Sequence, residues 1–468
     1  MAKRELDLVV QGGVVVNGNW SGPATVLVGQ GRIRAILDAD SPLPPEGRKA
    51  RVLDASGHLV IPGGVDPHCH IGLPLGEFST LDNYAEATTA ALWGGTTTVV
   101  DFAIPSPGQR PADAAAQRHK MAEEARCDTA LHGCVVKWDD TVPEQLAAMA
   151  VDGIRTIKMF TTYRGVVMAE PEAFLAVMRA LGPHRGLTYV HAEANHLIED
   201  AQSVAAHLGE VDAGHHDQTR PELAEAAAVA AVLATAEHER APVYFVHQST
   251  PEAVRLVRDA RRRGVRAYTE TCPHYLSLDA SVYRTENPEW FVCCPPVRAS
   301  ATVAGLRAAA VRGDIETIGS DHCCYDTSQK TMYTNDVRIM PNGLPGVETR
   351  LPVTWTILVK GAGLSPERFV GLFATNPARL NGLPGKGVIA PGADADLVVI
   401  DPDTPRVASA AELHMATDYT PYEGHELSGW PRIVVAGGQV VLDEEGFHDP
   451  GPVGRRLVAE PLFDPLTV

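Results

Sequence analysis

The sequence has no long hydrophobic run, little positive charge and no paired-cysteine motif. None of its apolar runs reaches the ~20 residues needed to cross a bilayer, so we expect no membrane-spanning segment. Its 40 Lys and Arg against 58 Asp and Glu give a formal net charge of −18, which argues against a nucleic-acid or anionic-membrane partner. The eight cysteines have neither disulfide-framework nor CxxC spacing. The first residues, MAKRELDLVVQGG, do not resemble a signal peptide, so we expect a cytoplasmic protein with reduced thiols.

Eight apolar segments rich in β-branched residues recur in the middle of the chain. They lie at residues 59–66, 96–102, 131–137, 154–160, 187–191, 243–247, 265–270 and 315–320. Most are followed by an Ala-rich stretch of helical period, for example residues 84–93 and 222–238. Alternating strands and helices favour a parallel sheet covered by helices, and eight such units predict a closed (β/α)₈ barrel. An open doubly wound sheet is the alternative, but no GxGxxG motif follows the first segment.

The two ends of the chain have a different pattern. Residues 6–57 and 386–447 contain short apolar runs joined by Gly and Pro turns, which is typical of antiparallel hairpins. We therefore predict an α/β protein with two domains. Both chain ends (residues 1–60 plus 385–450) form a small β-sandwich, and a TIM-like barrel (residues 61–384) is inserted between them. Residues 451–468 are predicted to be a C-terminal tail, either loose or draped over a neighbouring subunit.

Candidate metal ligands stand at the C-terminal ends of the predicted strands. His68 and His70 end the first strand, and their spacing places both side chains on the same side of it. Strand ends of a (β/α)₈ barrel meet at one face, where catalytic groups lie. A single strand-end histidine is more often a core or loop residue. The prediction of a metal site therefore depends on several such groups occurring together at strand ends. The other strand-end groups are Lys158, His191, His247 and Asp321. Four imidazoles and a carboxylate suit zinc or a similar divalent ion.

Lys158 has two interpretations. A buried lysine ordinarily has a carboxylate partner or a depressed pKa. Alternatively, its neutral amine reacts with carbon dioxide to give a carbamate, an anionic ligand with two oxygens that can bridge two cations. The residues alone leave both interpretations open.

The chain resembles the hydantoinase/dihydropyrimidinase group of cyclic amidohydrolases, and the resemblance covers nearly its whole length. Matching blocks in order include PGGVDPHCH, GGTTTVVDF, IKMFTTYRG, VHAE, VHQST, TETCPHYL, CCPPVR, IGSDHCCY and MPNGLPGVETR. The resemblance implies two divalent metal ions bridged by carboxylated Lys158, with zinc expected and manganese or cobalt as alternatives. It implies a homotetramer, with a dimer as the alternative. The implied ligands are His68, His70, Lys158 and Asp321 for the more buried ion, and Lys158, His191 and His247 for the more exposed one.

The same resemblance implies a reaction and the residues that perform it. The substrate would be a small cyclic amide, a hydantoin or dihydropyrimidine ring, which is hydrolysed to an N-carbamoyl amino acid. Asp321 would accept and return a proton, and Tyr163 would hydrogen-bond the oxyanion. Cys294 and Asn342 would hold the ring, mainly through backbone groups. Cys294 replaces a serine that is common in the group, which puts ring preference in question more than activity.

The residues that follow the two histidines bear on substrate choice. Ile71, Leu73 and Leu75 are apolar, where dihydroorotase- and allantoinase-like sequences usually have Arg or Asn, so we expect an apolar substituent pocket. His274 and Cys324 differ from many relatives, which indicates some shift in specificity. The alternatives are an allantoinase or cyclic-imide hydrolase on the same site, and a non-catalytic dihydropyrimidinase-related scaffold. The scaffold is disfavoured because all six ligands are present, and a mononuclear deaminase because it has no use for a strand-end lysine.

Overall fold

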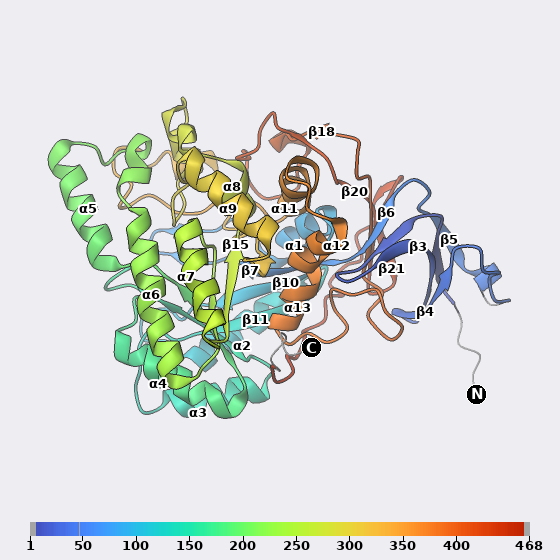
Figure 1. Ribbon diagram of the computed structural model, residues 1–468, viewed down its shortest axis with the longest axis horizontal. Coiled ribbons are helices and arrows are strands. Elements are labelled where there is room, and N and C mark those ends of the chain that lie inside the picture. The colour runs from blue at the N-terminus through green and yellow to red at the C-terminus, as the bar shows by residue number, and fades with distance from the viewer. Residues whose placement is uncertain (1–5, 46, 463–468) are drawn as a thin grey trace.

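The computed structural model describes residues 6–45 and 47–462, and its largest part is a barrel of parallel strands (Figure 1). Neighbouring strands follow the order β16-β15-β14-β13-β12-β11-β10-β7. A bridge between Cys69 and His322, just beyond β16, brings the last strand back to the first, so the barrel is nearly closed. The predicted (β/α)₈ barrel is confirmed. Its strands are β7 (Gly64–Cys69), β10 (Thr96–Ala103), β11 (Asp128–Cys134), β12 (Thr156–Phe160), β13 (Leu187–His191), β14 (Val243–Phe245), β15 (Ala267–Thr271) and β16 (Thr317–Ile318).

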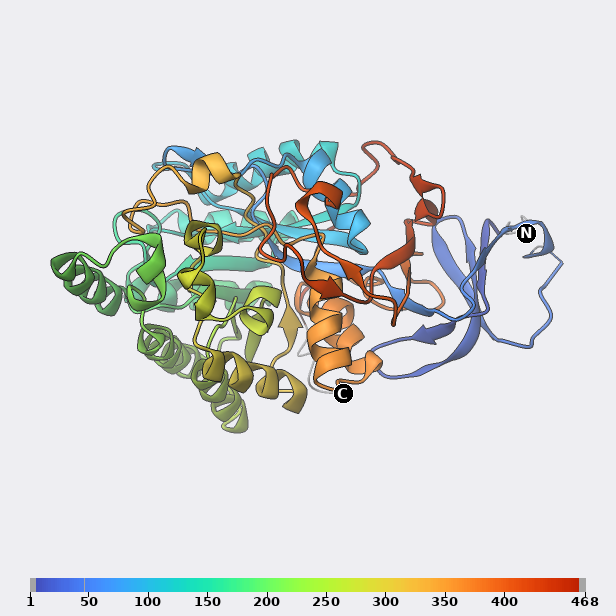
Figure 2. The same cartoon turned by 90° about the horizontal axis from the view of Figure 1, so that it is seen from above.

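Helices surround the barrel strands on the outside (Figures 1 and 2). None of them, within the described part of the chain, is both long and apolar enough to cross a bilayer. The longer ones are α1 (Tyr84–Trp93), α2 (Pro111–Met121), α3 (Val142–Val151), α4 (Pro171–Leu181), α5 (Asn195–Leu208), α6 (Glu222–Glu239), α7 (Pro251–Arg262) and α9 (Ser300–Arg312). The short ones are α8 (Pro273–Ser277), α10 (Thr327–Lys330), α11 (Arg350–Thr354), α12 (Pro366–Val370) and α13 (Asn376–Leu380).

A second, mixed sheet lies at one end of the molecule, opposite α5 (Figures 1 and 2). Its strands come from both chain ends, because β6 pairs antiparallel with β17 over the register Leu59↔Ile400 to Pro62↔Leu397. One hydrophobic core joins side chains of both ends, including Val26. The predicted small β domain from both ends is confirmed, while its residue limits stay a prediction. The strands are β1 (Leu8–Gln11), β2 (Val14–Val16), β3 (Ser21–Gly29), β4 (Arg32–Asp38), β5 (Arg51–Asp54), β6 (Leu59–Pro62), β17 (Leu397–Ile400), β20 (Pro431–Ala436), β21 (Gln439–Asp443) and β22 (Gly446–Phe447).

The first predicted strand, residues 59–66, is divided between the two sheets. Its first part is β6 of the mixed sheet and its second part begins β7 of the barrel. Two glycines make this close passage possible. A Cβ on Gly63 would lie 2.2 Å from Thr97 Oγ1, and one on Gly64 would lie 2.4 Å from Phe373 Cζ. Both parts are buried, so the sequence presents a single apolar run.

Residues 451–462 lie against the barrel of their own chain. Arg455 pairs with Asp128, at the start of β11, at 2.5 Å and with Asp394 at 2.6 Å. Further along, the Ala459 N–H donates to the Gly153 carbonyl at 3.0 Å. These residues are therefore not loose, and the expected contact with a neighbouring subunit stays a prediction. Residues 463–468 of the predicted tail lie outside the described residues.

Candidate metal centre

Four histidines, one lysine and one aspartate meet where the barrel strands end. His68 Nε2 and His70 Nε2 lie 3.0 and 3.3 Å from the same oxygen of Asp321. On the neighbouring side, His247 Nε2 lies 2.9 Å from His191 Nδ1. The two groups adjoin, since the rings of His68 and His247 have centroids 5.4 Å apart. Lys158 lines the same cavity as His70, His191, His247 and Asp321, so all six predicted ligands are brought together.

Two buried carboxylates orient the imidazoles. Glu270 Oε1 accepts from the ring of His68 at 2.6 Å and from the backbone N–H of His247 at 3.0 Å. Glu193 contacts Nε2 of His191 at 2.7 Å and forms a bidentate pair with Arg220. Such partners fix the ring orientation of a metal-binding histidine and raise its basicity. Our sequence analysis missed all three.

Two of these three orienting residues left a trace in the sequence. Glu193 follows its histidine by two residues in VHAE, and Glu270 ends the predicted strand at 265–270. A charged residue inside or just after a buried strand was therefore a usable signal. Arg220 stands before α6 in a segment without periodic pattern, and nothing in the sequence singled it out.

Lys158 is enclosed by apolar surface. Its side chain is buried, and Nζ lies 4.5 Å from the ring centroid of Phe102 and 5.1 Å from that of Phe160. Burial lowers its pKa to about 8, although the charges of Asp321 and Glu270 oppose the shift. A larger share of such amines is therefore neutral near pH 7.5 than at the ordinary pKa of 10.5. The environment therefore favours the nucleophilic form of the amine.

The donor set fits divalent cations. His68 Nε2 lies 3.2 Å from His70 Nε2, and the His191–His247 pair is equally close. Because two protonated nitrogens cannot face each other at these distances, at least one nitrogen of each pair presents a lone pair, as a zinc ligand must. Burial raises the pKa of Asp321, but the charge of His68 and hydrogen bonds from His68 and His70 outweigh it and hold that pKa well below its usual range. An ionised oxygen therefore completes the set.

The ligand cluster forms one wall of a cavity of about 420 Å³. Tyr163, Cys294 and Asn342, the three predicted substrate-binding residues, also line it. Much of the remaining wall is apolar, with side chains from several separate loops. These are Leu73, Leu75, Phe78, Ile104, Phe160, Val166, Val167, Ile339 and Met340. The cavity is large enough for a small ring with an apolar substituent.

Residues 59–441 match the model of the amidohydrolase family. The chain belongs to this family. It is 35% identical to the dihydropyrimidinase of Rattus norvegicus over 466 residues, 98% of this chain and 89% of that protein. It is also 35% identical to the D-hydantoinase of Streptomyces coelicolor over 447 residues, 94% of this chain and 95% of that one. The crystal structure of the dihydropyrimidinase from Brevibacillus agri superposes with a TM-score of 0.93 at 33% identity, covering 97% of this chain and 99% of that one.

The substrate-binding candidates of this amidohydrolase contact one another. The thiol of Cys294 donates to Oδ1 of Asn342 at 2.9 Å and is hydrogen-bonded to the Tyr163 hydroxyl. Nδ2 of Asn342 donates to the Met340 carbonyl at 3.1 Å. Burial raises the pKa of Cys294 to about 11, so the thiol stays protonated and able to donate. Since both ends of the Asn342 amide are engaged within the protein, its backbone is the part left for a ligand.

Not every residue predicted around the site reaches this cavity. Ile71 is fully buried in the barrel core, so its predicted place in the substituent pocket is wrong, whereas Leu73 and Leu75 do line the cavity. His274 is buried within 4.8 Å of Asp321 through their potential ligand atoms. Cys324 packs in the core and hydrogen-bonds a buried aspartate. Neither Cys324 nor His274 is among the residues that line the cavity, so their effect on specificity stays a prediction.

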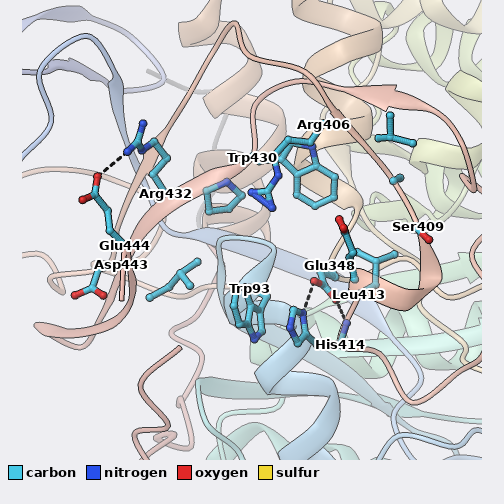
Figure 3. Close-up of a pocket in the computed structure, with 15 residues that line it drawn as sticks. Trp93, Glu348, Arg406, Ser409, Leu413, His414, Trp430, Arg432, Asp443 and Glu444 are labelled. Carbon is cyan, nitrogen blue, oxygen red and sulfur yellow. Dashed lines mark hydrogen bonds and ion pairs between the residues drawn. The ribbon is translucent and has the colours of Figure 1, made fainter. Parts of the chain in front are cut away.

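A second pocket, of about 240 Å³, lies at the junction of the barrel and the mixed sheet (Figure 3). In it the His414 ring stacks on Trp93 with centroids 3.9 Å apart, and its Nδ1 donates to Glu348 at 2.8 Å. Arg432 pairs with Glu444 at 2.6 Å. These charged groups are engaged with one another and the pocket holds none of the six ligand candidates. The cavity beside Lys158 is thus the better candidate for catalysis.

Proposed function

We propose that this amidohydrolase hydrolyses a small cyclic amide, a hydantoin or dihydropyrimidine ring, to an N-carbamoyl amino acid. The observation that carries the proposal is the meeting of six nitrogen and oxygen donors, five of which line a cavity whose remaining wall is largely apolar. Relatives named dihydropyrimidinase and D-hydantoinase match over nearly the whole chain, which supports this substrate class.

Two divalent cations would complete the site, zinc in the first instance, with manganese or cobalt as alternatives. The buried, apolar surroundings of Lys158 support its carboxylation, which would let it bridge the ions. When bound, such ions lower the pKa of water to about 7 and polarise a carbonyl group. The residues that would hold one ion are His68, His70, Lys158 and Asp321, and those that would hold the other are Lys158, His191 and His247.

Proton transfer falls to Asp321. Hydrolysis forms a bond from water oxygen to the ring carbonyl carbon and breaks the bond from that carbon to the ring nitrogen. The water must lose a proton, and the leaving nitrogen must gain one. Asp321 lies at the cavity wall and its depressed pKa makes it a carboxylate at the start, so it accepts the first proton and returns it to the nitrogen.

Tyr163 and the ring-binding backbone share the remaining work. Burial raises the pKa of Tyr163, and Cys294 adds to the shift, so its hydroxyl stays protonated as a donor to the developing oxyanion. Loss of one such donor typically lowers the rate by ~10²–10³-fold. The backbones of Cys294 and Asn342 would hold the ring, and the apolar wall with Leu73 and Leu75 would take its substituent.

Replacing Asp321 by asparagine tests the assignment. We expect turnover to fall by at least about 100-fold while both metals remain, measured by product formation and plasma emission on the same sample. The exposed Asp140→Asn is the matched control and should keep wild-type turnover. Turnover of Asp321→Asn within about tenfold of wild type, at full metal content, would contradict the proton-transfer role.

A substrate panel decides the substrate class. Wild-type enzyme loaded with zinc is assayed with dihydrouracil, phenylhydantoin, allantoin and succinimide. We expect turnover of the first two. Activity confined to allantoin or succinimide would replace the proposal by an allantoinase or a cyclic-imide hydrolase. No activity on any of the four would leave the scaffold interpretation.

We also propose a homotetramer, with a dimer as the alternative, in the cytoplasm, and the domain limits given by the sequence: residues 1–60 with 385–450, and 61–384. Native mass spectrometry at micromolar concentration measures the assembly directly. A monomer there would contradict the assignment.

A further inference from the structure

Lys330 ends the short helix α10 and its side chain is fully buried. Its Nζ donates to the carbonyl of Val292 at 2.7 Å and to that of Pro341 at 3.1 Å. The ring of Tyr325 lies on a further side, with its centroid 5.6 Å from Nζ. Burying an ammonium group costs free energy unless hydrogen bonds satisfy it, so the buried position of Lys330 indicates a specific role.

The two carbonyls belong to the two segments that line the candidate active site. Val292 stands two residues before Cys294, and Pro341 stands directly before Asn342. The segments also touch directly, since the N–H of Gly343 donates to the Val292 carbonyl at 3.1 Å. One side chain thus ties together both stretches of backbone that would hold the ring.

The contacts of Lys330 also act on the donors of these segments. A carbonyl and the N–H that follows it share one peptide group. Binding of a positive charge at the Pro341 oxygen therefore polarises the N–H of Asn342, and binding at the Val292 oxygen polarises that of Cys293. Hydrogen bonds in such chains strengthen one another, by perhaps 10–30% per bond. The ammonium group makes the neighbouring N–H groups better donors.

We propose that Lys330 is a positioning residue of this enzyme: it fixes the Cys294 and Asn342 segments relative to each other and strengthens their N–H groups toward the cyclic amide. This inference rests on the proposed function. The inference assigns Lys330 to substrate binding and leaves proton transfer to Asp321. Loss of the Lys330 ammonium group therefore raises KM more than it lowers kcat.

The test uses Lys330→Met, which keeps a long apolar side chain without charge. With dihydrouracil as substrate and zinc-loaded enzyme, we expect KM to rise at least about tenfold and kcat to change by less than about threefold. Metal content is measured on the same sample and should stay at the wild-type value. Lys330→Gln and Lys330→Arg accompany it, since the first retains N–H donors without charge and the second retains charge with a different shape. KM should increase in the order wild type, Arg, Gln, Met.

Lys386→Met is the matched control, because Lys386 is a buried lysine paired with three aspartates, one of which, Asp128, stands at the start of β11, away from the strand ends that form the site. It should lose stability and keep the wild-type KM. If Lys330→Met does not fold, the Arg and Gln variants carry the comparison. A wild-type KM in every folded variant, or a KM rise equal to that of Lys386→Met, would overturn the inference. Absence of turnover in the wild type would instead contradict the proposed function.

Discussion

Glu270 offers the sharpest test of how the metal site is held, because its carboxylate joins three groups. Oε1 accepts from His68 Nδ1 at 2.6 Å and from the His247 N–H at 3.0 Å, and Oε2 accepts from the Tyr244 hydroxyl at 2.7 Å. Two of these three groups belong to proposed ligands of different ions. Glu270→Gln keeps the shape and removes the charge.

The magnitude follows from these contacts. A hydrogen bond to a charged group contributes about 1.5–3 kcal/mol and a neutral one about 0.5–1.5 kcal/mol. The amide oxygen can still accept from His68 and His247, so each bond loses about 1 kcal/mol, or about 2 kcal/mol together. That corresponds to roughly 30-fold weaker metal binding, within the 10- to 100-fold typical of such partners.

Metal affinity is measured by competition with a chromophoric chelator, alongside kcat at saturating zinc. Glu225→Gln is the matched control, since Glu225 is also fully buried and accepts from Ser249 and Thr250 without touching a proposed ligand. It should lower stability and leave zinc affinity unchanged. Wild-type zinc affinity in Glu270→Gln would refute the orienting role, as would an equal loss in both variants.

Three further outcomes are expected. Lys386→Met leaves the buried Asp396 without a cation, while Asp128 and Asp394 keep Arg455, and should lower the free energy of unfolding by about 3–5 kcal/mol in urea titrations; a loss below 1 kcal/mol would contradict this. Burial lowers the pKa of His119 to about 4, so only the unfolded chain takes up the proton as pH falls from 6.5 toward 4, and stability drops by at most about 1.4 kcal/mol per unit. His119→Asn should reduce the slope of unfolding free energy against pH in this range, and identical slopes in the variant and the wild type would contradict this prediction. Gly343→Ala places a Cβ 2.5 Å from Cys323 Cβ at φ +148°, so kcat/KM should fall about 10- to 100-fold, and unchanged kinetics would show that the neighbouring backbone tolerates the shift.

The barrel and its ligand face could be predicted because they follow from local regularities. Buried parallel strands appear as apolar runs, and their ends meet at one face whatever the loops do. His191 therefore needed no long-range information. The division of residues 59–66 between two sheets could not be predicted. It depends on the close approach of Thr97 to Gly63 and of Phe373 to Gly64, which are distant from each other in the sequence.

Turn geometry explains one wrong prediction and contact distance explains one omission. Ile71 lies in the turn that follows β7, where its side chain joins the core, whereas Leu73 and Leu75 reach the cavity. The alternation of a strand ends with β7, so it could not place these three side chains. Arg220 could not be found this way, since its role depends on a bidentate contact with Glu193 across the barrel rim.

Backbone conformation at the site is the feature that residue types predict least well. Tyr163, His247 and Asp321 have φ of +66°, +38° and +51°, a region that costs a non-glycine residue about 1–2 kcal/mol. Local contacts hold them there: the His247 N–H donates to Glu270, and the Tyr163 carbonyl accepts from the N–H of Val166 at 3.0 Å. Glycine would relieve the strain at each position but would remove the side chain that the site requires. The strain therefore persists where a ligand or donor must leave its strand end at an unusual angle, which ties these three residues to function more firmly than to stability.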